Sequence, residues 1–366
     1  MLYRTKPLVT NCQCPSSLRH IILFCALILV MVAADGCTTV QPSLQEVDRS
    51  DHISGPVWPP PPQLSKIRFV ASFYGATEFE RKKSWFQKVF GTIFGEEEQE
   101  DRLLLRPYGI AEARGILYVT DPGSRVIHIF DMKNKADSTI RSARDEDFVS
   151  PIGIAVDKQG DIFVTDSILR KVFVFDGKGR FLREIGHPNM FVRPSGIAVS
   201  DNKVYVVDTH AHRVMVFDRE GHHLFNFGQD GVLKGQFHYP THIWIDRSNR
   251  LYITDSLNFR VQIFDESGKF ISSFGKHGDG SGDFASPKGI AADSDGHVYV
   301  ADAEFDNIQI FDTTGRLLLS FGESGRGKGQ LILPTGLFID DQDRIYVADS
   351  YNNRIQIFQY LKAKEK

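Results

Sequence analysis

A segment of roughly 45 residues recurs six times between residue 104 and residue 366, and this repetition limits the fold more than any other feature. A period of roughly 20 to 50 residues is typical of solenoids, propellers and other repeat architectures. Successive copies are separated by 44, 43, 46, 47 and 47 residues. The prolines that mark the start of the copies are Pro107, Pro151, Pro194, Pro240, Pro287 and Pro334.

Each copy carries the pattern of four short strands separated by turns. In the fourth copy the strands are HIWID, LYITD, VQIFD and KFISSFG, in which β-branched and aromatic residues alternate with polar ones. Such alternation predicts half-buried strands, and the Gly, Asn and Ser between them predict tight turns. Four antiparallel strands per copy, repeated six times, predict an all-β fold, the six-bladed β-propeller, over residues 104–366.

The sixth copy lacks the fourth strand of its blade, because only eight residues follow its third strand at 355–358. The stretch FVASF at 69–73 resembles the fourth strand FISSF at 270–274. An unpaired strand edge is open to association with other chains, so we expect residues 66–75 to pair with the last blade and close the ring. A chain that begins at residue 76 should then lose stability, and one that begins at about residue 64 should keep it.

The N-terminus has the pattern of an export signal. An apolar run of fourteen residues at 21–34 follows the basic residues Arg4, Lys6 and Arg19. The run is shorter than the roughly 20 residues that a transmembrane helix needs. Its length and its basic flank match the core of a signal peptide. We therefore expect residues 1–36 to be a signal peptide and the protein to be exported.

The sequence Ala-Asp-Gly-Cys at 34–37 resembles the bacterial lipoprotein box, in which small residues precede a lipidated cysteine. The resemblance implies lipidation at Cys37, although Asp35 departs from the small residue usual at its position. Ordinary cleavage after Ala34 is the alternative. Residues 37–65 contain the run WPPPP at 58–62, which favours an extended conformation, so we expect them to form a lipid-anchored, proline-rich tether.

Residues 76–103 do not fit the repeat and read as a helical insertion. Ser84 followed by Gln87 is a capping-box pattern, and apolar residues at helical spacing come after it. We expect a helix at about 84–94 that packs on the propeller, covers its opening, docks a partner or contacts the membrane. The residues of its apolar face are Trp85, Phe86, Val89, Phe90 and Ile93.

Charge and cysteine content exclude several classes of function. The net charge of −3 argues against a nucleic-acid partner, which would normally require a basic surface. The four cysteines all lie at or before Cys37. The repeats therefore hold neither a disulfide framework nor a cysteine nucleophile.

The copies resemble NHL repeats, most fully in PTHIWIDRSNRLYITDSLNFRVQIFDESGKFISSFG at 240–275 and PTGLFIDDQDRIYVADSYNNRIQIF at 334–358. The resemblance covers about 104–366 and implies the propeller fold, but it does not specify an activity. NHL-type lyases that cleave hydroxyglycine peptides take histidines from the position directly after the blade proline. That metal site does not carry over, because the residues there are Tyr108, Ile152, Ser195, Thr241, Lys288 and Thr335.

An aspartate ends the second strand of every copy, and we interpret these residues as structural. A cationic residue stands five positions later in four copies, as in Asp255 and Arg260, which indicates an ion pair or a loop cap within each blade. The four cations are Lys171, Arg213, Arg260 and Arg354. The six aspartates are Asp121, Asp166, Asp208, Asp255, Asp302 and Asp349.

The candidate binding residues lie where the first strands begin and in the loops between second and third strands, which share one face of a propeller. Their mixture of aromatic, hydroxyl and cationic groups suits a protein or glycan surface better than a deep catalytic pocket. They are Tyr108, Arg125, Ser195, His210, His212, Thr241, His242, Asn258, Phe259, Lys288, Phe305, Thr335 and Asn352.

The sequence favours a binding or scaffolding module at the bacterial cell envelope, with a protein or glycan partner and a membrane anchor. The alternative is a propeller enzyme, either a lyase that resembles the peptidyl-hydroxyglycine enzymes or a lactonase-like hydrolase. We expect no cofactor and no catalytic residues. His210, His212 and His242 are the candidate ligands if a metal is bound, since three converging imidazoles can hold zinc.

Overall fold

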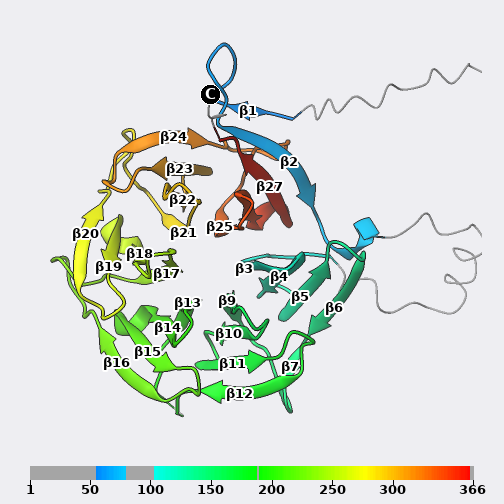
Figure 1. The fold of residues 1–366 in the computed structure, drawn as a ribbon, viewed down its shortest axis with the longest axis vertical. Coiled ribbons are helices and arrows are strands. Elements are labelled where there is room, and N and C mark those ends of the chain that lie inside the picture. Colours follow the sequence, from blue (N-terminus) through cyan, green and yellow to red (C-terminus); the bar gives the residue numbers. More distant parts are fainter. Residues whose placement is uncertain (1–54, 80–102, 188, 363–366) are drawn as a thin grey trace, which may run out of the picture. The chain divides into compact units, whose positions relative to one another are not determined.

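In the computed structural model, which describes residues 55–79, 103–187 and 189–362, the repeats form six blades around one axis (Figure 1). Five blades are four-stranded antiparallel sheets, and the sixth has five strands. The first strand of each blade lies nearest the axis and the fourth lies at the periphery (Figure 1). The predicted all-β, six-bladed propeller is confirmed.

The first three blades are built as the repeat predicts. Blade one comprises β3 (Ile110–Ala113), β4 (Ile116–Asp121), β5 (Val126–Asp131) and β6 (Ala136–Ile140). A short hairpin follows, β7 (Ser142–Ala143) and β8 (Glu146–Asp147). Blade two comprises β9 (Pro151–Val156), β10 (Ile162–Asp166), β11 (Lys171–Phe175) and β12 (Phe181–Ile185), and blade three comprises β13 (Pro194–Val199), β14 (Lys203–Asp208), β15 (Arg213–Asp218) and β16 (His223–Phe227).

The remaining blades keep the same strand order. Blade four comprises β17 (Pro240–Ile245), β18 (Leu251–Asp255), β19 (Arg260–Phe264) and β20 (Phe270–Phe274). Blade five comprises β21 (Pro287–Ala292), β22 (Val298–Asp302), β23 (Asn307–Phe311) and β24 (Leu317–Phe321). Blade six comprises β25 (Pro334–Ile339), β26 (Arg344–Asp349), β27 (Arg354–Tyr360), β2 (Ile67–Phe73) and β1 (Val57–Trp58). Short 3-10 turns follow three second strands, η3 (Thr209–Ala211), η4 (Ser256–Asn258) and η5 (Ser350–Asn352).

The ring is closed by the N-terminal strand, as the sequence predicts. Strand β2 pairs antiparallel with β27, with Phe69 opposite Phe358 and Phe73 opposite Ile355. In Figure 1 the blue β2 lies beside the red β27, so the two ends of the repeat array share one sheet. The Phe69 and Phe73 side chains are buried, which ties closure of the ring to the packing of the last blade.

The proline-rich segment differs from the prediction. The tether was expected to extend to residue 65, but β1 pairs with β2 and adds a fifth strand to blade six. The Trp58 ring lies 5.7 Å from Phe321 and 5.8 Å from Phe358, so it packs over the join of blades five and six. Burial of its large apolar surface outweighs the tendency of the prolines to stay extended. Residues 55–65 therefore belong to the folded unit, and loss of this packing should destabilise a chain that begins at residue 64.

The insertion leaves and rejoins the propeller at one place. Residues Ala76–Phe79 form a 3-10 turn, η1, and Phe79 lies 5.5 Å from Phe73. Gly75 forms a bridge with Leu103, which brings the two ends of the insertion together. The predicted helix at 84–94 with its apolar face, the signal peptide at 1–36 and Cys37 lie outside the described residues. Within the part of the chain that the structure describes, no helix has the length and apolar character needed to cross a bilayer.

The two faces of the propeller carry different connections. One face, here called the mouth face, holds the loops 209–212, 256–259 and 350–353 together with the connections between blades. The opposite face, here called the turn face, holds the turns between first and second strands, such as 157–161 and 340–344. This arrangement follows from antiparallel pairing of successive strands.

The repeated aspartates hold the blades together. Each of the six is fully buried, and Asp166 accepts hydrogen bonds from the backbone N–H groups of Val149 and Ser150 at 2.8 and 2.9 Å. The chain that enters each first strand is thereby fixed to the second strand of the same blade. Arg260 and Arg354 pair with their aspartates as predicted. Lys171 instead pairs with Glu146 at 2.5 Å, because the β7–β8 hairpin brings that carboxylate closer.

Candidate functional site

The hydroxyl groups of Ser195, Thr241 and Thr335, predicted to line the mouth face, bond within their own blade or to the next blade. The Ser195 Oγ lies 2.7 Å from the Thr209 Oγ1 and donates to the Thr241 carbonyl at 2.9 Å. The Thr241 Oγ1 in turn lies 2.7 Å from the Ser256 Oγ, and the Thr335 Oγ1 lies 2.6 Å from the Ser350 Oγ. These groups stabilise the ring itself and are poorly placed to bind a ligand.

The predicted loop residues are held in a similar way. Asn258 and Asn352 each donate to a backbone carbonyl of the preceding blade connection at 2.9 Å. The Phe259 ring lies 4.3 Å from that of His277, and Phe305 is half-buried. Arg125 is the predicted loop cation and is exposed. Asn258, Asn352 and Phe259 therefore have structural partners within the propeller.

The axis is narrowed near the mouth face by two stacked rings. Tyr108 of blade one and His242 of blade four lie with ring centroids 5.6 Å apart and planes 13° apart. The other five blades have glycine at the position of His242, where the blades pack very tightly. At Gly336, for example, an added Cβ would lie 1.9 Å from the Tyr108 carbonyl oxygen. His242 is the one large side chain at this position, and its ring therefore stacks on that of Tyr108 at the axis.

Burial determines the protonation states of His242 and Tyr108. Burial, assisted by the positive charge of Lys288, lowers the pKa of His242 to about 3. Burial raises the pKa of Tyr108 to about 12 and lowers that of Lys288. The His242 Nε2 is buried and has no hydrogen-bond partner among the described residues. At neutral pH the pair is an uncharged imidazole beside an uncharged phenol.

The His242→Phe variant should remove a pH dependence from stability. Because the pKa of His242 is about 3 in the folded protein and 6.5 in the reference state, the unfolded chain binds the additional proton between these values. Stability is therefore lost as the pH falls below 6.5. Phenylalanine keeps the ring without the titration. Urea unfolding at pH 7.5 and 5.0 should show that the wild type loses more stability than the variant, by about 2 kcal/mol. Equal losses would contradict the assignment.

Behind the stacked pair lies a small axial cavity of about 190 Å³. Its lining is largely apolar and comes from the first strands, with Ile154, Ile197 and Ile243 among its residues. Binding sites for small molecules usually measure about 300–1,000 Å³. The axial cavity is below that range and lacks convergent polar groups.

The larger opening lies on the turn face, where a basin of about 1030 Å³ is bounded by the turns after the first strands. Trp244 and Phe338 line both the basin and the axial cavity, so they form the floor between them. Their rings lie 5.5 Å apart at 72° and are half-buried. The basin thus combines a two-ring aromatic floor with a polar wall.

Charges of both signs form the wall of the basin, and many are paired with one another. Lys158 lies 2.7 Å from Asp201, and Arg344 lies 2.6 Å from Asp340. The Asp340 Oδ1 also accepts a hydrogen bond from the N–H of Gln342 and so caps its own turn. These ion pairs neutralise much of the charge that faces the basin and leave hydrogen-bonding groups exposed to it.

The sequence prediction placed the binding residues on the face opposite the basin. The signal for the basin was present, because Trp244 and Phe338 occupy a position that is alanine in the other four copies. Alternation along a strand indicates which residues lie on the same face of the sheet. It does not indicate which end of the axial channel is wider, because the width depends on how side chains from opposite blades pack across the ring.

The three candidate metal-binding histidines do not come together. His242 lies on the axis against Tyr108, whereas the His210 ring packs on Tyr239 at 5.3 Å. His212 lies with Asp230 and His238 instead. The grouping at the mouth face therefore differs from the one that sequence alone suggested.

Comparison with protein families identifies the repeat. The NHL repeat family matches residues 191–217 and 331–358, and a family described as 6-bladed beta-propeller matches residues 248–304. This chain is a six-bladed propeller that contains NHL repeats. The NHL propeller is also similar to a probable peptidyl-alpha-hydroxyglycine alpha-amidating lyase of Caenorhabditis elegans, with 28% identity over 127 residues. That match covers 30% of this chain and only 36% of the relative.

Solved structures share the fold of this NHL propeller. A streptogramin B lyase has a TM-score of 0.53 at 18% identity, covering 70% of this chain and 94% of that one. An auxiliary nutrient binding protein from Bacteroides ovatus has a TM-score of 0.56 at 15% identity, covering 71% of this chain and 70% of that one. A virginiamycin B lyase from Staphylococcus aureus, at 16% identity, scores 0.53 and covers 70% and 95%. Identities this low show the fold alone.

Proposed function

We propose that this NHL propeller is an exported, lipid-anchored binding protein of the bacterial cell envelope, and that its turn-face basin binds a neutral polyhydroxylated ligand, an oligosaccharide. The observation that carries the proposal is the aromatic floor formed by Trp244 and Phe338 beneath a wall of paired charges. Binding sites commonly combine apolar and aromatic surface with a few polar groups that fix orientation. The nutrient-binding propeller from Bacteroides ovatus shares only the fold, which is compatible with such a role.

The charge pattern of the wall favours a neutral ligand. Many of the carboxylates and cations are already partnered, as in Lys158 with Asp201 and Arg247 with Asp341. A charged ligand would compete with these pairs and bring its charge against groups of the same sign. Hydroxyl groups can both donate and accept, so they can bond to either member of a pair without breaking it. The apolar edges of a sugar ring would lie on the Trp244 indole.

The lyase alternative is less well supported. The positions that hold histidine in hydroxyglycine lyases hold none here. Among the described residues one imidazole, that of His242, lines the axial cavity, and its Nδ1 lies 3.1 Å from the Thr241 Oγ1. Because burial lowers the pKa of His242 to about 3, this imidazole is a weak proton acceptor, and the axial cavity of about 190 Å³ leaves little room for a peptide substrate.

The Trp244→Ala variant should lose glycan binding. Truncation of an aromatic anchor typically costs about 2 kcal/mol or more, which corresponds to a roughly 30-fold weaker affinity. A glycan array would identify a ligand, and calorimetry would compare its affinity for the wild type and the variant. The matched control is Tyr351→Ala, which removes an exposed aromatic ring from the mouth face and should leave the affinity unchanged. Absence of any bound glycan, or equal affinities for wild type and Trp244→Ala, would contradict the proposal.

The Cys37→Ala variant tests the proposed anchor. Lipidation requires the cysteine thiol, so the variant should move from the membrane fraction to the soluble fraction after export. Fractionation of cells that express each form would show the change. Unchanged membrane association of a correctly processed variant would argue against lipidation at this residue, without bearing on the basin.

A further inference from the structure

Three potential metal ligands meet at the join of blades three and four on the mouth face. His212 follows the turn η3, and Asp230 and His238 belong to the connection between β16 and β17. The Asp230 Oδ1 lies 3.3 Å from the His212 Nδ1 and 3.0 Å from the His238 Nδ1. One ligand atom from each residue lies within 4.8 Å of those of the other two.

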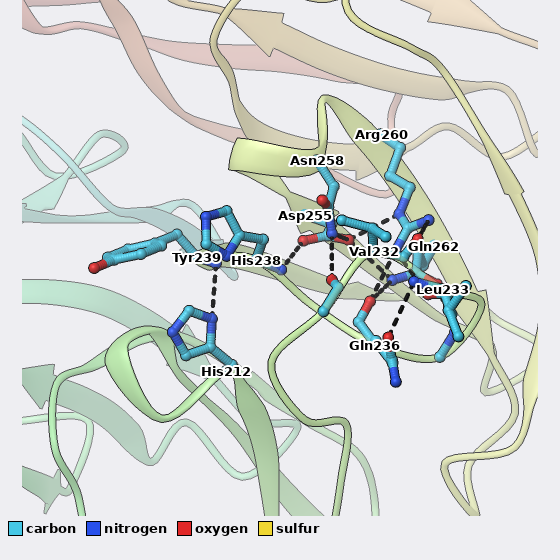
Figure 2. Close-up of polar contacts among 12 residues, drawn as sticks. His212, Val232, Leu233, Gln236, His238, Tyr239, Asp255, Asn258, Arg260 and Gln262 are labelled. Atoms are coloured by element: carbon cyan, nitrogen blue, oxygen red, sulfur yellow. Dashed lines mark hydrogen bonds and ion pairs between the residues drawn. The ribbon is translucent and has the colours of Figure 1, made fainter.

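The His212 Nδ1 faces both a backbone donor and a carboxylate. The backbone N–H of Tyr239 donates to the His212 Nδ1 at 3.3 Å, so this nitrogen carries a lone pair (Figure 2). The carboxylate oxygen of Asp230 faces the same nitrogen, and it too can only accept when ionised. Two acceptors this close repel each other, and either a proton on the imidazole or a metal ion bound between them relieves the repulsion. The hydrogen bond from the Tyr239 N–H is long and therefore weak. Little stabilisation is lost if the His212 Nδ1 binds a metal ion instead.

The backbone around the three ligands is held firmly. Arg260 donates to the carbonyl oxygens of Val232, Leu233 and Gln236 at 2.8 to 2.9 Å (Figure 2). The N–H of His238 donates to Asp255 at 2.6 Å. Metal sites are tight when their ligands stand on such a rigid frame. Here the frame fixes the backbone, while the exposed side chain of Asp230 and the half-buried side chain of His238 can rotate to complete the site.

The same frame recurs between other blades with different side chains. In the connection after blade four, the residues aligned with His212, Asp230 and His238 are Phe259, His277 and Ala285. In the connection after blade five they are Asp306, Ser324 and Ile332, and Asp306 accepts the N–H of Leu333 just as His212 accepts that of Tyr239. Of these three equivalent connections, the one between blades three and four alone carries three metal-ligating side chains.

We propose that His212, Asp230 and His238 form a Zn²⁺ site. Two imidazoles and one carboxylate are ligands that zinc accepts, and three protein ligands leave a fourth position for water or an anionic group. Zinc ligands at about 2.0–2.1 Å in a tetrahedron lie about 3.3 Å apart, close to the separations of Asp230 from the two histidines. Nitrogen ligands disfavour Ca²⁺ and Mg²⁺, which prefer oxygen. This site lies on the opposite face from the proposed glycan basin and is independent of it.

Calorimetry with ZnCl₂ on the full chain, prepared without a polyhistidine tag, tests the site. We expect one Zn²⁺ per chain, no competition by millimolar Ca²⁺ or Mg²⁺, and affinity at least about 100-fold weaker in both His238→Ala and Asp230→Asn. The control is His222→Ala, which removes an exposed histidine paired with Asp218 at 2.9 Å and should bind zinc as the wild type does.

Folding of the metal-free variants can be checked by circular dichroism, so that loss of binding is not confused with loss of structure. Absence of zinc binding by the wild type would overturn the proposal. So would unchanged binding by both His238→Ala and Asp230→Asn, because zinc would then occupy another place.

Discussion

A chain that begins at residue 76 will not form a stable propeller, whereas one that begins at residue 55 will fold. Strand β2 supplies the hydrogen-bonding partner of β27 and buries Ile67, Phe69 and Phe73. Each such side chain contributes about 1.5–3 kcal/mol, and total stability is typically about 5–15 kcal/mol. Loss of all three, together with exposure of the β27 edge, is therefore expected to remove most of the stability.

Urea unfolding of chains that begin at residues 55, 64 and 76 measures this effect. The chain that begins at 64 keeps β2 but lacks Trp58, so its midpoint should lie below that of the longest chain. The shortest chain should be unfolded or aggregated without denaturant, because its unpaired edge is open to other chains. Coincident unfolding curves for all three chains would refute closure by the N-terminal strand.

The Arg354→Ala variant will be destabilised by about 3–5 kcal/mol, the usual cost of leaving one member of a buried ion pair without its partner. Arg354 is 3% exposed and its Nε donates to the fully buried Asp349 at 2.7 Å. It also donates to the carbonyl oxygens of Gly327 and Gln330 at 2.9 and 2.8 Å. The substitution therefore removes a charge partner and the clamp on the connection that enters blade six.

The matched control is Arg213→Ala in blade three. There the guanidinium lies 4.0 Å from Asp208 and is 31% exposed, so the expected loss is below about 1 kcal/mol. Chemical unfolding of both variants gives the comparison directly. Equal effects at the two blades would show that the burial and hydrogen bonds of Arg354 do not set its contribution.

The fold was predictable because its signals are local and repeated. Six in-register copies fix the number of blades, and the match of 69–73 to a fourth strand gives the closing element. The prediction that residues 55–65 belong to a tether was wrong because a proline run has the same sequence whether it is exposed to solvent or packed against the propeller. What decides its place is Trp58, whose contacts with Phe321 and Phe358 join residues more than 200 positions apart.

The proposed sites were less predictable because they arise where blades meet. His212 and His238 are 26 residues apart in the sequence, and they come together through the packing of one blade on the next. The basin depends on Trp244 and Phe338, whose departure from alanine was visible but whose meeting across the axis was not. The candidate residues lie on the mouth face, at one end of the axis, whereas the wider opening is at the other end.

Hydrogen exchange measured by mass spectrometry, with and without a bound glycan, tests the central claim most directly. Binding in the basin predicts protection of the turns at 112–115, 157–160, 246–249 and 340–343. The loops at 209–212, 256–259 and 350–353 on the mouth face should exchange as they do in the free protein. Protection confined to those mouth-face loops would contradict the account and place the ligand on the face that sequence alone suggested.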